Sequence, residues 1–124
     1  MTDELRSDRF GPTLVVRLGP AYNSLAESVL EAVEKYLLAA AETPEAKHLV
    51  VDLSSTHYFG SRFIESLFRA HNRMKRKGGK FALCGLQSYP LEIVTISRLD
   101  KIWPIFATAD EAVKAFASIE PEKK

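Results

Sequence analysis

Residues 48–67 read HLVVDLSSTHYFGSRFIESL, and this stretch decides the fold. The apolar residues of segment 48–53 are consecutive rather than alternating, a pattern typical of a central strand that is buried on both faces. A polar turn follows, and a helix is predicted from Gly60-Ser61 to Lys77, where Gly78-Gly79 suit the left-handed end of a helix. The side of this helix that faces the core is expected to carry Ile64, Leu67, Phe68, His71 and Met74.

The sequence before this unit predicts another strand and another helix. Residues 13–18, TLVVRL, are β-branched and apolar, and Gly19-Pro20 stops the strand. Ser24 and Glu27 form a capping box, S-x-x-E, which predicts the start of a helix that ends before Thr43-Pro44. Its buried face is expected to consist of Leu25, Val29, Val33, Leu37 and Ala40.

Four further elements are expected after the two glycines. Residues 81–86, FALCGL, predict a second buried strand, and residues 103–107, WPIFA, predict a short last one. Pro90 opens a short helix through Leu99, with Leu91 and Val94, and Ile96 as a further candidate, facing inward. A second capping box starts the last helix at Thr108 and Glu111. The inner face of that helix is expected to carry Ala112, Val113, Phe116 and Ile119.

Strands and helices therefore alternate, which predicts a mainly parallel sheet with right-handed crossovers. We expect a single α/β domain over residues 13–119, with a mixed, mostly parallel sheet of four to five strands packed with about four helices. Residues 1–12 form an N-terminal segment that could add an edge strand, and residues 120–124 form a flexible tail. Loops at the carboxyl ends of parallel strands are favoured functional sites, and the loop 54–61 is one of them.

Composition limits the class of protein. The 124 residues suit one domain, and 46% apolar with 27% charged residues is an ordinary globular balance. A net charge of +1 gives no reason to expect nucleic acid as a partner. One cysteine excludes an internal disulfide, no apolar run approaches the roughly 20 residues that span a bilayer, and residues 1–8 do not resemble a secretory signal. We expect a cytoplasmic protein, monomeric or weakly dimeric.

Groups that could carry chemistry are sparse. No dinucleotide fingerprint or P-loop occurs, and three histidines with one cysteine are too scattered for a zinc site. Cys84 could act as a nucleophile with His57 or His71 as base, but its apolar run favours an inert buried thiol. Asp52 is either a catalytic carboxylate or, more commonly, the cap of the following turn. His71 is expected to be semi-buried and hydrogen-bonded. We expect no cofactor, no metal and no enzymatic activity.

Residues 50–67, VVDLSSTHYFGSRFIESL, resemble the core of the STAS domain, the family of bacterial anti-sigma factor antagonists. Members show a buried strand ending in Asp-Leu, a short turn, an aromatic or apolar pair, and then Asp-Ser-Ser/Thr-Gly-Leu-Gly opening a helix. Residues 76–85, RKGGKFALCG, are similar to the family's glycine-separated helix and strand. Residues 99–106, LDKIWPIF, and 110–112, DEA, are similar to its later segments. The resemblance extends from about Thr13 to Ile119.

The resemblance implies a mechanism. An antagonist of this family binds a serine kinase that also holds a sigma factor, and phosphorylation of one serine on the antagonist breaks the contact. Ser61 falls on that serine. A phosphate there adds roughly −1.5 to −2 charges at a helix N-terminus, where the dipole and the N–H groups favour an anion. Arg62 could pair with the phosphate. The alternative role for Ser61 is a plain helix N-cap.

The sequence departs from the family pattern around Ser61. The aspartate before the serine is Gly60, and the second Ser/Thr is Arg62. The two later glycines are Phe63 and Glu65, and the first loop, 19–22, lacks the acidic residue of many antagonists. Phe63 at an exposed helix start predicts an apolar contact surface together with Tyr58, whereas Phe59 is expected to pack into the core. The expected partner-binding residues are Tyr58, Gly60, Ser61, Arg62, Phe63 and Tyr22.

Two functions follow from these observations. The first is a protein-binding regulator of the anti-sigma antagonist type, with a serine kinase as partner. The second is a soluble STAS-like accessory subunit of a membrane transport system, such as a lipid-exporting ATPase, without a phosphoswitch. The helix 61–77 also has a basic side, which either binds an acidic partner, a lipid headgroup or RNA or, as we favour, is a solvated face suited to the helix C-terminus. Its cations are Arg69, Arg73, Lys75, Arg76 and Lys77.

Overall fold

The computed structural model describes residues 5–19, 22, 24–25 and 27–119. The strands are β1 (Leu5–Phe10), β2 (Thr13–Leu18), β3 (Ser24–Leu25), β4 (His48–Asp52), β5 (Tyr58–Phe59), β6 (Phe81–Cys84) and β7 (Ile105–Phe106). The helices are α1 (Glu27–Ala41), α2 (Ser61–Arg76), α3 (Ser88–Ile96), the 3₁₀ turn η2 (Leu99–Lys101) and α4 (Ala109–Ile119). The predicted flexible tail and the side chain of Ile119 lie outside what the structure describes.

The main sheet has five strands in the order β1-β2-β4-β6-β7. β1, from the N-terminal segment, forms one edge and runs antiparallel to β2, whereas all other neighbours in this sheet run parallel. The register places Val15 opposite Val50, and Val50 opposite Ala82. Within the described residues, the predicted α/β architecture of a mixed, mostly parallel sheet with four helices is confirmed.

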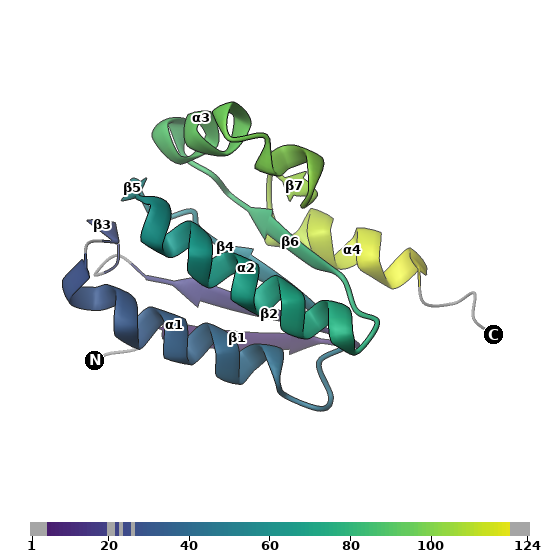
Figure 1. Cartoon of the computed structure of the whole chain (residues 1–124). Helices are drawn as coiled ribbons and strands as arrows, with labels where there is room; N and C mark the ends of the chain where they lie inside the picture. The colour runs from purple at the N-terminus through teal and green to yellow at the C-terminus, as the bar shows by residue number, and fades with distance from the viewer. Residues whose placement is uncertain (1–4, 20–21, 23, 26, 120–124) are drawn as a thin grey trace.

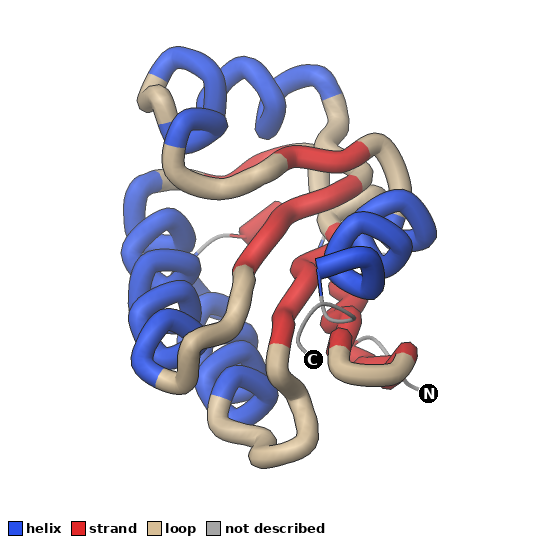
Figure 2. The backbone as a smooth tube through the Cα atoms, turned by 90° about the vertical axis from the view of Figure 1, so that its right-hand side faces the viewer, coloured by secondary structure: helices blue, strands red, loops and turns tan. Residues whose placement is uncertain are grey.

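Helices cover both faces of the main sheet (Figures 1 and 2). α1 and α2 pack side by side on one face, over the larger core. α4 lies on the opposite face, where Ala112 and Phe116 cover Val15, Val50 and Cys84. α3 lies beyond the edge of the sheet that β7 forms, in both views. The sheet therefore separates two apolar cores, as helices on both faces of a parallel sheet require.

The segment 24–25 does not lead into a helix through a capping box. Ser24 and Leu25 form β3, which pairs in parallel with β5, and α1 begins only at Glu27. Leu25 is buried as expected, but it reaches the core from a strand. The prediction was wrong because pairing with β5 holds these residues extended, and that contact joins segments more than 30 residues apart.

The buried side of α2 is shifted relative to the prediction. Leu67 and Met74 are fully buried as expected, whereas Ile64, Phe68 and His71 are only partly buried. The fully buried positions follow a spacing of three to four residues that starts two residues after the helix begins. They are Phe63, Ser66, Leu67, Ala70 and Met74.

α3 is shorter than predicted and buries less of its surface. It ends before Leu99 because Arg98 takes a left-handed φ of 62°, which an α-helix cannot continue. Val94 is buried as predicted, but Leu91 is 43% and Ile96 71% exposed, so their predicted inward orientation is wrong. This nine-residue helix lies beyond the edge of the sheet and packs along a single narrow side.

Glycine and threonine set the ends of two further elements. β6 ends at Cys84, two residues earlier than predicted, because Gly85 takes a φ of +71°. The predicted role of Thr108 at the start of the last helix is confirmed, since its Oγ1 accepts a hydrogen bond from the N–H of Glu111 at 3.2 Å, which is one of the two bonds of a capping box. Trp103, which was predicted to lie in the last strand, precedes β7 and is nevertheless buried.

The predicted glycine end of α2 is confirmed in detail. The N–H of Gly79 donates to the carbonyl of Met74 at 2.8 Å, and the N–H of Gly78 donates to that of Lys75 at 3.0 Å. This pair of bonds, with a φ of +77° at Gly78, is a Schellman motif. Lys77 next to it donates from Nζ to two carbonyls in the loop between α1 and β4, at 2.9 and 2.8 Å. The end of α2 is thereby fixed to the neighbouring loop.

Candidate functional site

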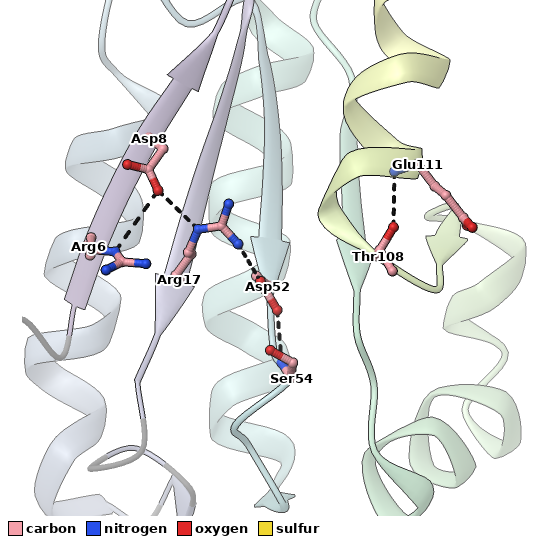
Figure 3. A network of polar contacts seen from close by, with 7 residues as sticks. All are labelled: Arg6, Asp8, Arg17, Asp52, Ser54, Thr108 and Glu111. Carbon is pink, nitrogen blue, oxygen red and sulfur yellow. Dashed lines mark hydrogen bonds and ion pairs between the residues drawn. The ribbon is translucent and has the colours of Figure 1, made fainter.

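The turn after β4 is held by Asp52. Its Oδ1 accepts a hydrogen bond from the N–H of Ser54 at 3.0 Å, so the predicted role as turn cap is confirmed. Its Oδ2 accepts from Nη1 of Arg17 at 2.8 Å, and Nε of Arg17 donates to Asp8 at 3.0 Å (Figure 3). Burial alone would lower the pKa of Arg17, but the two carboxylates outweigh it and raise that pKa. The start of the turn is thus tied to three strands.

The second half of the turn is anchored by two phenylalanine rings. Phe59 is 1% exposed and lies in the core as predicted. Phe63 is fully buried, so the expectation that it forms an exposed contact surface is wrong. The two ring centroids are 5.2 Å apart, and Phe63 shares its buried stripe with Leu67 and Ala70. The two rings therefore anchor the junction of β5 and α2 to the core, and the exposed surface of the junction is formed by other residues.

Ser61 is the first residue of α2, and its side chain is exposed. The N-cap position belongs to Gly60, whose backbone is extended at φ −121° and ψ −166°, and no side chain caps the helix. The interpretation of Ser61 as the N-cap is therefore wrong. The N–H groups of Phe63 and Ile64 both donate to the carbonyl of Gly60, at 3.1 and 3.3 Å, and the N–H groups of the first turn point toward the helix start. The hydroxyl of Ser61 thus stands beside the positive end of the helix dipole and faces solvent.

Two stacked tyrosines lie at the β5 side of the junction between β5 and α2. Tyr58 of β5 and Tyr89 of α3 are 45% and 44% exposed, and their ring centroids are 5.6 Å apart at an interplanar angle of 20°. A Cβ atom on Gly60 would lie 3.3 Å from the hydroxyl of Tyr58, so the glycine leaves room for this ring. Tyr58 was predicted as a surface residue. Tyr89 was not, and its exposure on a separate helix gave no periodic signal that could have identified it.

Tyr22 approaches the same turn through its backbone. Its carbonyl accepts a hydrogen bond from the hydroxyl of Thr56 at 3.4 Å, and its N–H donates to the carbonyl of Gly19 at 2.9 Å. The side chain is partly buried against the larger core. The predicted residue therefore lies beside the turn, whereas residues 20–21 of the first loop lie outside the described part of the chain.

The possible catalytic groups do not come together. Cys84 is buried on the α4 side of the sheet, and burial raises the pKa of its thiol to about 12, with a further contribution from the charge of Asp52. His71 packs against Phe81 on the other side, and His57 is exposed. His71 is partly buried as predicted, but its Nδ1 atom has no hydrogen-bond partner within the described residues. No three metal-ligating side chains cluster within the same residues.

The sequence profile of the STAS domain matches residues 14–112. The chain belongs to the STAS domain family. One relative is BtrV of Bordetella bronchiseptica, whose name describes an anti-sigma factor antagonist; it is 25% identical over 95% of this chain and 98% of its own length. The resemblance predicted from the sequence is confirmed.

Solved STAS structures share this fold. An anti-sigma factor antagonist (STAS) domain protein from Planctomyces limnophilus is 31% identical, with a TM-score of 0.85 over 91% of this chain and 97% of that one. An anti-sigma factor antagonist from Mycobacterium paratuberculosis, 21% identical, has the same fold with a TM-score of 0.78 over 91% and 92% of the two chains. This STAS domain therefore resembles anti-sigma factor antagonists. Among the described residues no helix is long and apolar enough to cross a membrane.

Proposed function

We propose that this STAS domain is a protein-binding regulator of the anti-sigma factor antagonist type, which binds a serine kinase that also acts as an anti-sigma factor. The contact is made at the start of α2, and phosphorylation of Ser61 breaks it. The observation that carries the proposal is the exposed position of Ser61 as the first residue of α2. A kinase can reach this hydroxyl without unfolding the domain. The proposal places the protein in the cytoplasm, where kinase and ATP meet.

The position suits a phosphate within the domain itself. No acidic residue lies in the first turn of α2. Glu65, one turn further on, is the nearest carboxylate of the helix and opposes a phosphate on Ser61 only weakly, because it is exposed to solvent. The positive end of the helix dipole stabilises a phosphate of roughly −1.5 to −2 charges. The domain therefore keeps its fold when modified. The effect of the phosphate falls on the partner, whose complementary face must then accommodate a buried charge.

The proposed contact surface differs from the predicted one by two residues. Phe63 is removed from it because its ring is buried. Tyr89 is added because it stacks on Tyr58 and is exposed to the same extent. Exposed tyrosines are common anchors of protein interfaces. The surface then consists of Tyr58, Gly60, Ser61, Arg62 and Tyr89, with Tyr22 at its edge.

Gly60 removes a negative charge from the proposed contact surface. The family pattern has a carboxylate before the serine, whereas here the Tyr58 hydroxyl lies over the glycine, 3.3 Å from where a Cβ would be. The partner of this domain therefore meets an aromatic ring instead of a negative charge. We expect its own face to be less basic at this point than that of a partner selected for an aspartate.

The test is incubation with the host's STAS-binding serine kinases and ATP, followed by intact-mass measurement. The mass of one phosphate, mapped to Ser61 and lost in Ser61→Ala, is the expected result. Ser54→Ala is the matched control because this exposed serine lies in the same loop, and its N–H bond to Asp52 does not use the side chain. Retention of the phosphate in Ser61→Ala would contradict the switch. Ser61→Asp is expected to weaken capture of the kinase, whereas Ser54→Asp is not.

The accessory-subunit function makes the opposite prediction. A STAS domain that serves a membrane transport ATPase would acquire no phosphate under any kinase tested. It would instead co-purify with that ATPase from solubilised membranes, and Ser61→Ala would leave the co-purification unchanged. This outcome would replace the proposed regulator by the transport function.

A further inference from the structure

A pocket lies at the C-terminal end of α2, where the helix ends and β6 begins. Its volume is about 380 Å³, and it opens to solvent between α2, the start of β6 and the segment that precedes β7. Its lining includes His71, Lys75, Lys80, Phe81, Ile102 and Pro104. His71 and Lys75 follow Ser61 by 10 and 14 residues, or about 15 to 20 Å along the helix axis. The pocket is therefore separate from the proposed contact surface.

One wall of this pocket is apolar and firmly held. Phe81 is 3% exposed, and its ring packs edge-on against that of Trp103, with centroids 5.3 Å apart. Trp103 in turn packs against Phe68 of α2 at 4.9 Å. Ile102 is 49% exposed and lines the same opening. A ligand that covers the exposed Ile102 and Pro104 would remove apolar surface from water, which favours binding, while Phe81 forms the nearly buried floor of the pocket.

Two lysines line the pocket beside this apolar wall. Lys75 and Lys80 both line the pocket, and no carboxylate does. Within the described residues no ion pair is formed by either lysine, although neighbouring cations of α2 have partners. Arg69 pairs with Glu34, and Arg73 pairs with Glu42. The two lysines therefore leave an uncompensated positive charge beside an apolar wall.

His71 adds a polar group to the same lining. Its Nδ1 is buried without a hydrogen-bond partner among the described residues. Burial lowers the pKa of its imidazole, and the charge of Lys75 lowers it further. Lys75 follows His71 by four residues, so the two side chains are neighbours on the surface of α2. The backbone amides nearby are already used, because the N–H of Gly79 donates to Met74 and that of Lys80 donates to Nδ1 of His48. The pocket thus offers two ammonium groups and one imidazole, but no cradle of amides for a phosphate.

We propose that this pocket binds a small amphiphilic carboxylate, with the carboxylate between Lys75 and Lys80 and the apolar body against Phe81, Ile102 and Pro104. The charge of the lysines matches a monoanion, and the wall matches a compact aromatic or aliphatic group. The inference does not rest on the proposed function, since it uses no residue of the β5–α2 junction. A failure of either proposal leaves the other standing.

The test is titration of the ¹⁵N-labelled protein with benzoate, followed by amide shifts in two-dimensional NMR spectra. Benzoate is expected to give saturable shifts at residues 75, 80, 81 and 102. Benzyl alcohol, which lacks the charge, and inorganic phosphate, which lacks the apolar body, are each expected to bind more weakly. Lys75→Gln and Lys80→Gln are each expected to weaken benzoate binding roughly fivefold, the weight of one partly screened charge pair.

Lys35→Gln is the matched control, because Lys35 is an exposed lysine of α1 that does not line the pocket. Its affinity for benzoate is expected to equal that of the unmodified protein. Absence of saturable shifts at the pocket would overturn the proposal. So would phosphate binding as tightly as benzoate, or an equal loss of affinity in Lys35→Gln, because either result reduces the site to a general attraction between charges.

Discussion

Two glycines end α2: Gly78 has a left-handed backbone, and Gly79 packs too closely against another segment for a side chain. Replacing each by alanine measures these two requirements separately. Gly78 has a φ of +77°, but a Cβ there would meet nothing within 4 Å. Gly78→Ala therefore costs only the left-handed strain, about 1–2 kcal/mol. At Gly79 a Cβ would lie 1.8 Å from the carbonyl oxygen of Lys47, a distance that a carbon and an oxygen not bonded to each other do not tolerate. Because that oxygen belongs to the backbone, no rotamer change can relieve the clash.

The cost of Gly79→Ala follows from what must move. If the loop before β4 shifts, it loses the hydrogen bonds from the N–H groups of Lys47 and His48 to the carbonyl of Pro12, at 2.8 and 3.0 Å. If α2 shifts instead, it loses the bond from Gly79 to Met74. A buried hydrogen bond left unmade costs about 1–3 kcal/mol. Gly79→Ala is therefore expected to lower the free energy of unfolding by about 2–6 kcal/mol if the loop shifts and by about 1–3 kcal/mol, plus the packing of α2 that is disturbed, if the helix shifts. The ordinary total is about 5–15 kcal/mol.

Urea unfolding followed by far-UV circular dichroism measures both variants. The expected order is wild type, then Gly78→Ala, then Gly79→Ala, with the denaturant dependence unchanged so that the midpoints report stability. If Gly79→Ala unfolded at the same urea concentration as Gly78→Ala, or at a higher one, the close packing of α2 against the loop before β4 would be refuted.

Three further predictions concern buried groups. Phe63→Ala is expected to cost about 3–5 kcal/mol in urea unfolding, whereas the exposed Glu65→Ala costs little; equal effects would contradict the burial of this ring. Cys84 is expected to react with a thiol reagent at pH 8 only after unfolding, because burial raises its pKa to about 12, and rapid labelling of the native protein would refute this. His71 has a pKa lowered from 6.5, so the unfolded chain binds a proton that the folded protein disfavours. The wild type therefore loses stability as the pH falls below 6.5, and this loss is absent at higher pH. Because glutamine does not titrate, the stability of His71→Gln relative to wild type is expected to rise as the pH is lowered from 7.5 to 5, and no rise would refute the prediction.

The fold was predictable because its main elements are locally determined. The consecutive apolar residues of β4 and β6 indicate central strands whatever surrounds them. The glycines after α2 indicate the helix end by their backbone requirements alone. β3 and β5 could not be predicted, because each is two residues long and exists only through pairing with the other. No periodicity can develop over two residues.

The candidate site was predictable in position but not in orientation. The strand-to-helix order places Ser61 at an exposed helix start, and the structure has it there. The side of α2 that faces the core was not predictable, since Phe63 and Ile64 are adjacent and the helix could bury either of them. The position of Phe59 decides between them, because its ring contacts Phe63 in the core. Tyr89 joins the surface only through the packing of α3 beside β5.

The burial of Cys84 has a practical consequence for following this domain in solution. The chain contains a single cysteine, and its thiol is enclosed between the sheet and α4. A cysteine introduced at an exposed position, such as Ser61→Cys, would therefore be the one readily alkylated sulfur of the native protein. A fluorophore attached there would lie at the proposed contact surface, so its emission would change when a partner protein binds. Cys84 would not have to be replaced first.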